Sequence, residues 1–396
     1  MAQQHHEMTG TGTAAEATGE ALAVHLQDQA TEFLRSLRLH RESTTDAQGA
    51  EESLEAARAL RRAARRIGAA LHTFRPLLDP QWSAALRPEL AWLSGTLAQE
   101  HAHATRLTRL LDALHRLSGP PPVPSPTPPL EAATTAGGRS TPVGTTHDAV
   151  PAVGRRSAGR LGRPLLERSR ELGEGWAQHQ PPGTEQPGST TRTLTVGAAK
   201  AAALLERQLT LARTRAHSTA LQALGSSRFH AVADSIALLA SEVPFSGATP
   251  SLEQLAATAE ADLAEAVEAL PLGRAGHPYN AEALAHGLHA AESAPDAQDA
   301  PWLKVRSLLR LYRYAQEVVE GPASLEPRLR EASHALNVHR EAAAAATAAA
   351  QAARTPRIAP ATAYALGVLH ADQRHEVEAA RFAFQRAWQH ETVGTA

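Results

Sequence analysis

Five arginines lie close together in the segment LEAARALRRAARRIGAALHTFRPLL, residues 54–78, and they are well suited to bind an anion. Apolar residues alternate at steps of three and four along this segment, which predicts a helix with one apolar face. The arginines lie away from that face, and only Arg58 has an acidic residue, Glu55, three or four positions away. Guanidinium groups bind phosphate oxygens through paired hydrogen bonds, so this face favours a phosphate ligand. The five residues are Arg58, Arg61, Arg62, Arg65 and Arg66.

A second arginine-bearing helix is predicted over PWLKVRSLLRLYRYAQEVV, in the second half of the chain. Its apolar positions include Val305, Leu309 and Tyr312, and its arginines follow an adjacent face at steps of four and three. The repetition indicates an internal duplication, with two similar bundles facing each other. The arginines of this second helix are Arg306, Arg310 and Arg313.

The competing interpretation of both arginine faces is a solvated helix surface, because charged residues opposite an apolar seam usually point to water. Lysine occurs only at Lys200 and Lys304, so the number of arginines carries little weight by itself. Four of the five arginines in the first helix have no acidic residue three or four positions away, and a similar row of arginines recurs in the second helix. Both observations favour anion binding. Converging arginines would neutralise a polymer that carries about one negative charge per unit.

The composition favours an all-helical protein without disulfides. Hydrophobic residues make up 43% of the 396 residues, much of that share is alanine, and only 4% of the residues are aromatic. The chain has no cysteine, and its formal net charge of -2 argues against binding nucleic acid by bulk attraction. The shortage of aromatics for base stacking also makes nucleic acid an unlikely partner. Any anion site must therefore be local.

The apolar pattern divides the chain into two helical halves, and no strand with period-two alternation is evident. We expect a disordered tail over residues 1–20, a first helical half over 21–118, a Pro/Gly-rich linker or insertion over 119–193, and a second helical half over 194–392. Within the second half, helices are predicted at about 194–224, 227–239, 251–269, 280–292, 301–320, 325–353 and 360–390.

The location predicted from the sequence is the cytoplasm. The first 20 residues have neither the basic stretch nor the apolar run of a secretory leader. No apolar run approaches the roughly 20 residues that a membrane span requires.

Motifs of catalysis and metal binding were also sought. The sequence contains no GxxxxGK[ST], GxSxG, HExxH or ExExK motif, so no catalytic residue and no cofactor is predicted. Glu282, His286 and His289 could share a helix face, and His101 lies close to His103. A metal site needs three or four ligands with oriented neighbours, and no further set of ligands accompanies these residues. The sequence therefore predicts no metal site.

The segment ARALRRAARRIGAALHTFRPLL resembles the signature helix of the CHAD family, the conserved histidine α-helical domains. Arg61, Arg65, Arg66 and the Phe-Arg-Pro ending fall on matching positions. The segments ALGSSRFHAVADSIALL, RLYRYAQEVV, ALNVHREAAAAA and AYALGVLHADQRHEVEAARFAFQRAWQ are similar to later parts of the family pattern, in the same order. The resemblance implies an all-α fold of two antiparallel bundles related by a pseudo-twofold axis. It also implies a basic groove or pore that binds inorganic polyphosphate, often on polyphosphate granules, without catalysis.

The chain departs from this family pattern at named positions. Arg58 and Leu303 stand where the family has its two signature histidines, and Leu311 takes a place that is usually basic. Arg306, Arg310, Arg313 and His339 remain. Helix geometry adds two arginines to those that the resemblance supplies. The predicted polyphosphate ligands are thus Arg58, Arg61, Arg62, Arg65, Arg66, Arg306, Arg310, Arg313 and His339.

A different class of function is also open at this point. A helical scaffold or adaptor protein could keep the fold and lose polyphosphate binding, as the two replaced histidines allow. The segment PPPVPSPTPP, residues 120–129, could adopt a polyproline II helix and dock a protein partner. A protein partner that binds through residues 120–129 would favour the hypothesis of a scaffold or adaptor.

Overall fold

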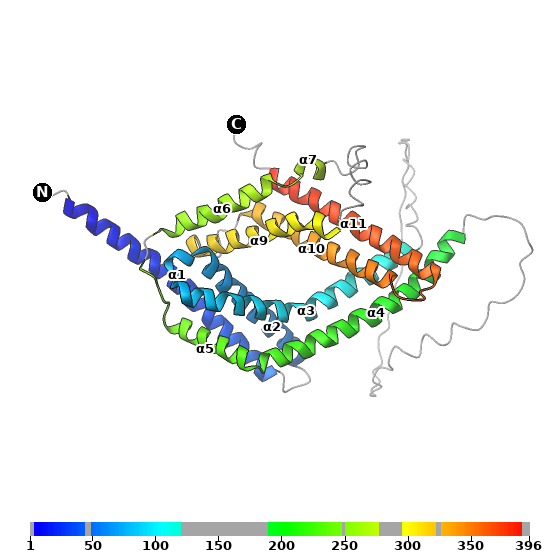
Figure 1. Ribbon diagram of the computed structural model, residues 1–396, viewed down its shortest axis with the longest axis horizontal. Helices are drawn as coiled ribbons and strands as arrows, with labels where there is room; N and C mark the ends of the chain where they lie inside the picture. Colours follow the sequence, from blue (N-terminus) through cyan, green and yellow to red (C-terminus); the bar gives the residue numbers. More distant parts are fainter. Residues whose placement is uncertain are drawn as a thin grey trace, which may run out of the picture. The chain divides into compact units, whose positions relative to one another are not determined.

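Helices make up nearly all of the computed structural model, which describes residues 4–43, 49–119, 189–247, 250–276, 295–321 and 326–389 (Figure 1). The all-α prediction is confirmed. Within these ranges the β pairing is limited to an isolated bridge between Leu78 and Phe245. Most of the predicted linker and the predicted helix over 280–292 lie outside the described residues.

The first hydrophobic core is enclosed mainly by helices of the N-terminal part of the chain. Its largest buried side chains include Phe33, Phe74 and Phe229, and α5 contributes to it although it follows the predicted linker. Most of this core comes from α1 Gln4–Ser43, α2 Gly49–Thr73, α3 Pro80–Ser118 and α5 Ser227–Ser241, with the short helix η1 Arg75–Leu77, and two later helices add Leu252, Ala256, Ala315 and Val318. In the structure α1 begins at Gln4, within the 1–20 segment that the sequence suggested to be a tail.

Two further cores lie among the remaining helices. One contains Trp302 and Phe384, and the other joins the C-terminal part of α3 to residues such as Ala345 and Leu366. Figure 1 shows α10 and α11 side by side, and these two helices make the most extensive helix contact of the described chain. The helices are α4 Ser189–Leu224, α6 Leu252–Glu268, α7 Leu272–Ala275, α9 Pro295–Val319, α10 Pro327–Ala353 and α11 Pro360–Gln389.

The ends of several helices follow directly from local sequence. Asp79 caps α3, because its side chain accepts a hydrogen bond from the Trp82 backbone N at 2.7 Å. The sequence predicted that the first arginine-bearing helix would extend to residue 78, but in the structure this helix, α2, ends at Thr73. The cause is Pro76, which lacks a backbone N–H and disfavours helical geometry in the residue before it. The chain makes the η1 turn there and then enters α3.

The apolar seam predicted for α2 is confirmed. Leu60, Ile67 and Leu71 are fully buried, whereas the arginines between them are not part of the core. Helix α2 packs on α1, α3 and α9, and three of its arginines, Arg61, Arg65 and Arg66, lie at the boundary with α9. Among the described helices, none combines the length and the apolar character needed to cross a bilayer.

Candidate anion-binding site

A cavity of about 770 Å³ lies between α2, α3 and α9. We call it the arginine pocket. Residues of α2, η1 and α3 form one wall, residues of α9 form the other, and α10 adds one side chain. No carboxylate is found among the described residues that line it. Its ionisable lining residues are Arg61, Arg65, His72, Arg75, Arg87, Arg306, Arg310 and Arg340.

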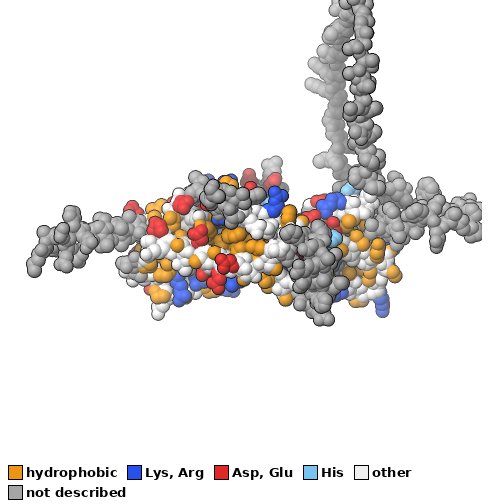
Figure 2. Space-filling model, turned by 90° about the horizontal axis from the view of Figure 1, so that it is seen from above, with side chains coloured by type: hydrophobic (Ala, Val, Ile, Leu, Met, Phe, Trp, Pro, Cys, Tyr) orange, Lys and Arg blue, Asp and Glu red, His pale blue; other side chains and the backbone are white. Residues whose placement is uncertain are grey.

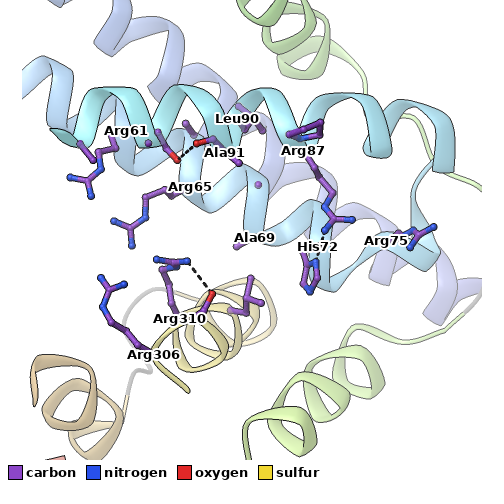
Figure 3. A pocket seen from close by; sticks show the side chains of 18 of the residues that line it. Arg61, Arg65, Ala69, His72, Arg75, Arg87, Leu90, Ala91, Arg306 and Arg310 are labelled. Carbon is purple, nitrogen blue, oxygen red and sulfur yellow. Dashed lines mark hydrogen bonds between the residues drawn. The ribbon is translucent and has the colours of Figure 1, made fainter. Parts of the chain in front are cut away.

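The two predicted arginine helices meet across this pocket (Figure 3). Arg61 and Arg65 of α2 extend toward Arg306 and Arg310 of α9. Each pair is separated by four positions, so both of its members lie on one side of their helix. The neighbouring apolar residues are buried in the cores, which fixes the rotation of both helices. Packing of the apolar seams therefore brings the arginines of α2 and α9 together.

These four arginines have no acidic partner in the described part of the chain. Arg306 Nε donates to Asn337 Oδ1 at 2.8 Å, and Arg310 Nη2 donates to Ser307 Oγ at 3.4 Å. The Nε atoms of Arg61 and Arg65 are buried without a hydrogen-bond partner. Neutral oxygens satisfy only part of the donor capacity of these side chains, so their positive charge is not compensated locally.

The crowding of positive charge is reflected in the pKa values of the arginines. Burial lowers the pKa of Arg306 to about 9, and Arg340 and Arg310 beside it contribute further. Burial, followed by the charges of Arg65 and Arg340, lowers the pKa of Arg61 to about 10. Both groups stay protonated at neutral pH. Their charged forms are less favourable here than in water, and an anion in the pocket would relieve this.

Two of the predicted ligands, Arg58 and Arg62, lie outside the pocket at the surface of α2. Arg58 Nη1 and Arg62 Nη2 contact the carboxylate of Glu55 at 3.3 and 2.9 Å, and the side chains of both arginines are about half exposed. Arg62 lies seven positions from Glu55, two helical turns away, so the rule of partners three or four positions apart does not predict this contact. For these two arginines the structure favours the solvated surface.

Arg66 and Arg313 were also predicted as ligands, and neither lines the arginine pocket. Arg66 Nε donates to Glu317 Oε2 at 2.7 Å, and its guanidinium lies 5.5 Å from the ring centre of Tyr314. This contact joins α2 to α9. Arg313 has a buried Nε atom without a hydrogen-bond partner, and burial lowers its pKa. The partner of Arg66 is distant in sequence, so helical spacing could not reveal it.

His339, which was also predicted as a ligand, does not line the arginine pocket. It is fully buried, and its ring stacks on Trp302 with the ring centres 5.9 Å apart. Its Nε2 lies 3.5 Å from Asp299 Oδ1 and 3.4 Å from Arg381 Nε. His339 faces the core because the apolar seam of α10 includes its position. It therefore joins α10 to α9 and α11 and does not contact the pocket.

Four ionisable residues of the pocket wall were not predicted from the sequence, namely His72, Arg75, Arg87 and Arg340. Arg87 Nη2 donates to His72 Nδ1 at 2.7 Å, and burial followed by the charge of Arg87 lowers the pKa of His72. Arg75 belongs to the Phe-Arg-Pro ending, and Arg340 directly follows His339, so both lay within segments that resemble the family. Nothing in the spacing marked Arg87, because α3 meets α2 only through tertiary packing.

Positive charge does not dominate the described surface on the face that Figure 2 shows. The face shown in Figure 2 carries acidic, basic and apolar side chains side by side. The described residues contain no group of three or more His, Asp or Glu side chains suited to hold a metal ion. Glu282, His286 and His289, which could share a helix face, lie outside the described residues.

Comparison with known proteins agrees with this architecture. The family model of the CHAD domain matches residues 28–321, and the chain belongs to this family. The solved structure of PptA from Streptomyces chartreusis is similar, with a TM-score of 0.66 and 52% sequence identity. The match covers 94% of this chain and 99% of that one. No curated protein matches the sequence.

Proposed function

We propose that this protein binds inorganic polyphosphate in the arginine pocket and does not cleave it. The observation that carries the proposal is the meeting of Arg61 and Arg65 of α2 with Arg306 and Arg310 of α9, none of which has an acidic partner among the described residues. Membership of the CHAD family supports the same ligand. A pocket with many arginines and no described carboxylate has a strongly positive potential, which favours a polyanion over a neutral or singly charged ligand.

The chemistry of the pocket fits the repeating unit of polyphosphate. Each internal unit carries one negative charge and two free oxygens, and a guanidinium group can donate to both oxygens at once. Arginines on two facing helices could contact the polymer from opposite sides. The pseudo-twofold relation between the two bundles belongs to this proposal, because a shared groove would let both halves contact one chain.

Titration with long-chain polyphosphate at two salt concentrations, about 50 and 200 mM, tests the proposal. Several arginine–phosphate contacts release counterions, so affinity should fall steeply between these concentrations. Absence of binding at the lower salt concentration would overturn the proposal. It would leave the helical scaffold or adaptor as the remaining interpretation.

The absence of cleavage is tested separately. After prolonged incubation with the protein, the length of the polyphosphate should be unchanged on a gel, and no orthophosphate should be released. Shortened chains would contradict this part of the proposal. We further propose that the protein acts in the cytoplasm at polyphosphate granules. A fluorescent fusion that stays diffuse in granule-containing cells would contradict that placement.

A further inference from the structure

A smaller cavity of about 50 Å³ adjoins the arginine pocket between α3 and α10. We call it the end recess. Arg61, Ala98 and Arg340 line both cavities, so the two are contiguous. The other lining residues of the end recess are His101, Ala102, Thr105, Arg106, Arg109, Glu341 and Ala344.

The end recess lies where the space between α3 and α10 closes. Directly after the lining residues Arg109 and Ala344, Leu110 of α3 and Ala345 of α10 belong to a single core and are fully buried, as is Ala349 one turn further along α10. These side chains fill the space between the two helices. A ligand that extends along α3 from the arginine pocket therefore cannot continue past the end recess in that direction.

The polar groups of the recess provide donors in excess. The Nε atoms of Arg61, Arg106 and Arg340 are buried without hydrogen-bond partners. Arg109 is engaged elsewhere, because it donates to Gln373 at 2.6 Å and contacts Glu376 at 3.4 Å.

The local charge is also in excess. Glu341, whose Oε1 lies 3.1 Å from Arg340 Nη2, is the one carboxylate among the described lining residues. Three arginines and one glutamate leave the recess with a charge of +2, because Arg109 is balanced by Glu376.

We propose that the end recess binds the terminal phosphate of a linear polyphosphate whose following units lie in the arginine pocket. This inference rests on the proposed function and names the form of the ligand. The recess, at about 50 Å³, is far smaller than the arginine pocket of about 770 Å³, so it suits a single phosphate group and not a stretch of polymer. A polymer with both neighbouring units attached would not fit in it.

Charge distinguishes the end of the polymer from its interior. An internal unit carries a charge of -1, whereas a terminal phosphate resembles a phosphate monoester and carries about -1.5 to -2 at pH 7. The excess charge of the recess matches the terminal group. His101 and Thr105 add neutral polar atoms, and burial followed by the charges of Arg58 and Arg61 lowers the pKa of His101.

The test compares two polyphosphates of equal length, one with free ends and one whose ends are both capped as ethanolamine phosphoramidates. Capping lowers the charge of the terminal group and makes it too large for the recess. We expect the wild-type protein to bind the free-ended polymer about tenfold more tightly, which corresponds to about 1.4 kcal/mol.

Two variants separate charge from shape. Arg106→Gln removes one orphaned donor, and Ala102→Leu fills the recess with an apolar side chain. Each should reduce the tenfold preference to less than about twofold and leave affinity for the capped polymer nearly unchanged. Arg87→Gln, in the arginine pocket and outside the recess, is the matched control and should weaken binding of both polymers equally. Circular dichroism and urea unfolding would establish that all three variants are folded.

The possible outcomes distinguish this inference from the proposed function. Equal affinity of the wild-type protein for capped and free-ended polymer would overturn the inference and leave the proposed function standing. A preference that survives in both Arg106→Gln and Ala102→Leu would overturn the assignment to the end recess. Failure of the wild-type protein to bind either polymer would overturn the proposed function itself.

Discussion

Two groups of arginines near α9 differ in what balances their charge. Arg374 and Arg381 of α11 contact opposite oxygens of Asp299 at 2.7 and 2.6 Å, and Arg381 also contacts Glu378 at 2.7 Å. We call Asp299, His339, Arg374 and Arg381 the Asp299 cluster. The arginine pocket is lined by seven arginines, against two in the Asp299 cluster, and by no described carboxylate.

The comparison separates arginines that hold the fold from arginines available to a ligand. Asp299 is 5% exposed, and although burial alone would raise its pKa, the adjacent His339 and Arg374 lower it to about 2. Its carboxylate therefore stays ionised and compensates the buried arginines. Arg61, Arg65, Arg306 and Arg310 of the pocket have no carboxylate partner among the described residues, and an external anion would relieve the repulsion between them.

The largest expected effect is on stability, in the Asp299 cluster. Asp299→Ala removes the carboxylate that Arg374 and the buried Arg381 share, and should lower the free energy of unfolding by roughly 3–5 kcal/mol. Urea denaturation followed by circular dichroism measures this. Asp372→Ala is the matched control, because Asp372 pairs with the largely exposed Arg116, and it should change stability by less than about 1 kcal/mol. Similar losses of unfolding free energy in the two variants would show that the Asp299 cluster stabilises the fold no more than a surface ion pair does.

The next effect is on affinity, in the arginine pocket. Arg61→Glu with Arg65→Glu, or Arg306→Glu with Arg310→Glu, should weaken polyphosphate binding at least tenfold, about 1.4 kcal/mol. The first pair should have the larger effect, because α9 carries Leu303 and Leu311 where the family has a histidine and a basic residue, and because Arg61 lines both cavities. Helicity should be retained, since Glu is a good helix former and these positions are off the apolar seam.

The same helix offers a control for the charge reversal. Arg58→Glu with Arg62→Glu makes the same change in net charge on α2, at residues that contact Glu55 outside the pocket. Affinity should change by less than about threefold. If this control weakens binding as much as the pocket pair, then long-range charge and not the pocket determines affinity.

A smaller effect is expected on the stability of the free protein. Arg310→Gln removes one of the crowded charges of the pocket and keeps a side chain that can form hydrogen bonds. Because burial and the charge of Arg65 lower the pKa of Arg310, its charged form is unfavourable in the fold. The variant should gain about 0.5–1 kcal/mol in the free energy of unfolding, measured without ligand. A loss of stability like that of Asp299→Ala would show that Arg310 holds the fold.

The smallest effect concerns pH. The pKa of His72 is lowered by burial and then by Arg87, with Asp262 opposing and Arg75 adding to the effect. Its protonation is unfavourable in the free protein, so unfolding free energy falls as pH drops below about 6.5. Bound polyphosphate favours the protonated ring, so affinity should rise about threefold from about pH 7.5 to 5.5. Polyphosphate titrations over this pH range should show a smaller rise in affinity for His72→Gln than for the wild-type protein. An equal rise in affinity would exclude His72 as the source of the pH dependence.

Several features could be predicted from single segments of the sequence. The steps of three and four along α2 predicted its buried seam, because a helix places such residues on one face whatever surrounds it. The same periodicity placed Arg61 and Arg65 together, and Arg306 and Arg310 together. The order of the quoted segments, compared with the family pattern, indicated a CHAD fold, and the family match confirms it. The predicted extension of α2 beyond Thr73 was wrong, because periodicity does not register that Pro76 disfavours helical geometry in the residue before it.

Only the tertiary structure decided which arginines are free. Arg66 is neutralised by Glu317, which lies 251 positions away in sequence, and His339 is turned into the core by the packing of α10. Arg87 and Arg340 enter the pocket because α3 and α10 close around it. Periodicity determines the face of a helix on which a side chain lies. The charge that balances the side chain is set by its spatial neighbours, and in a bundle these neighbours come from helices distant in sequence.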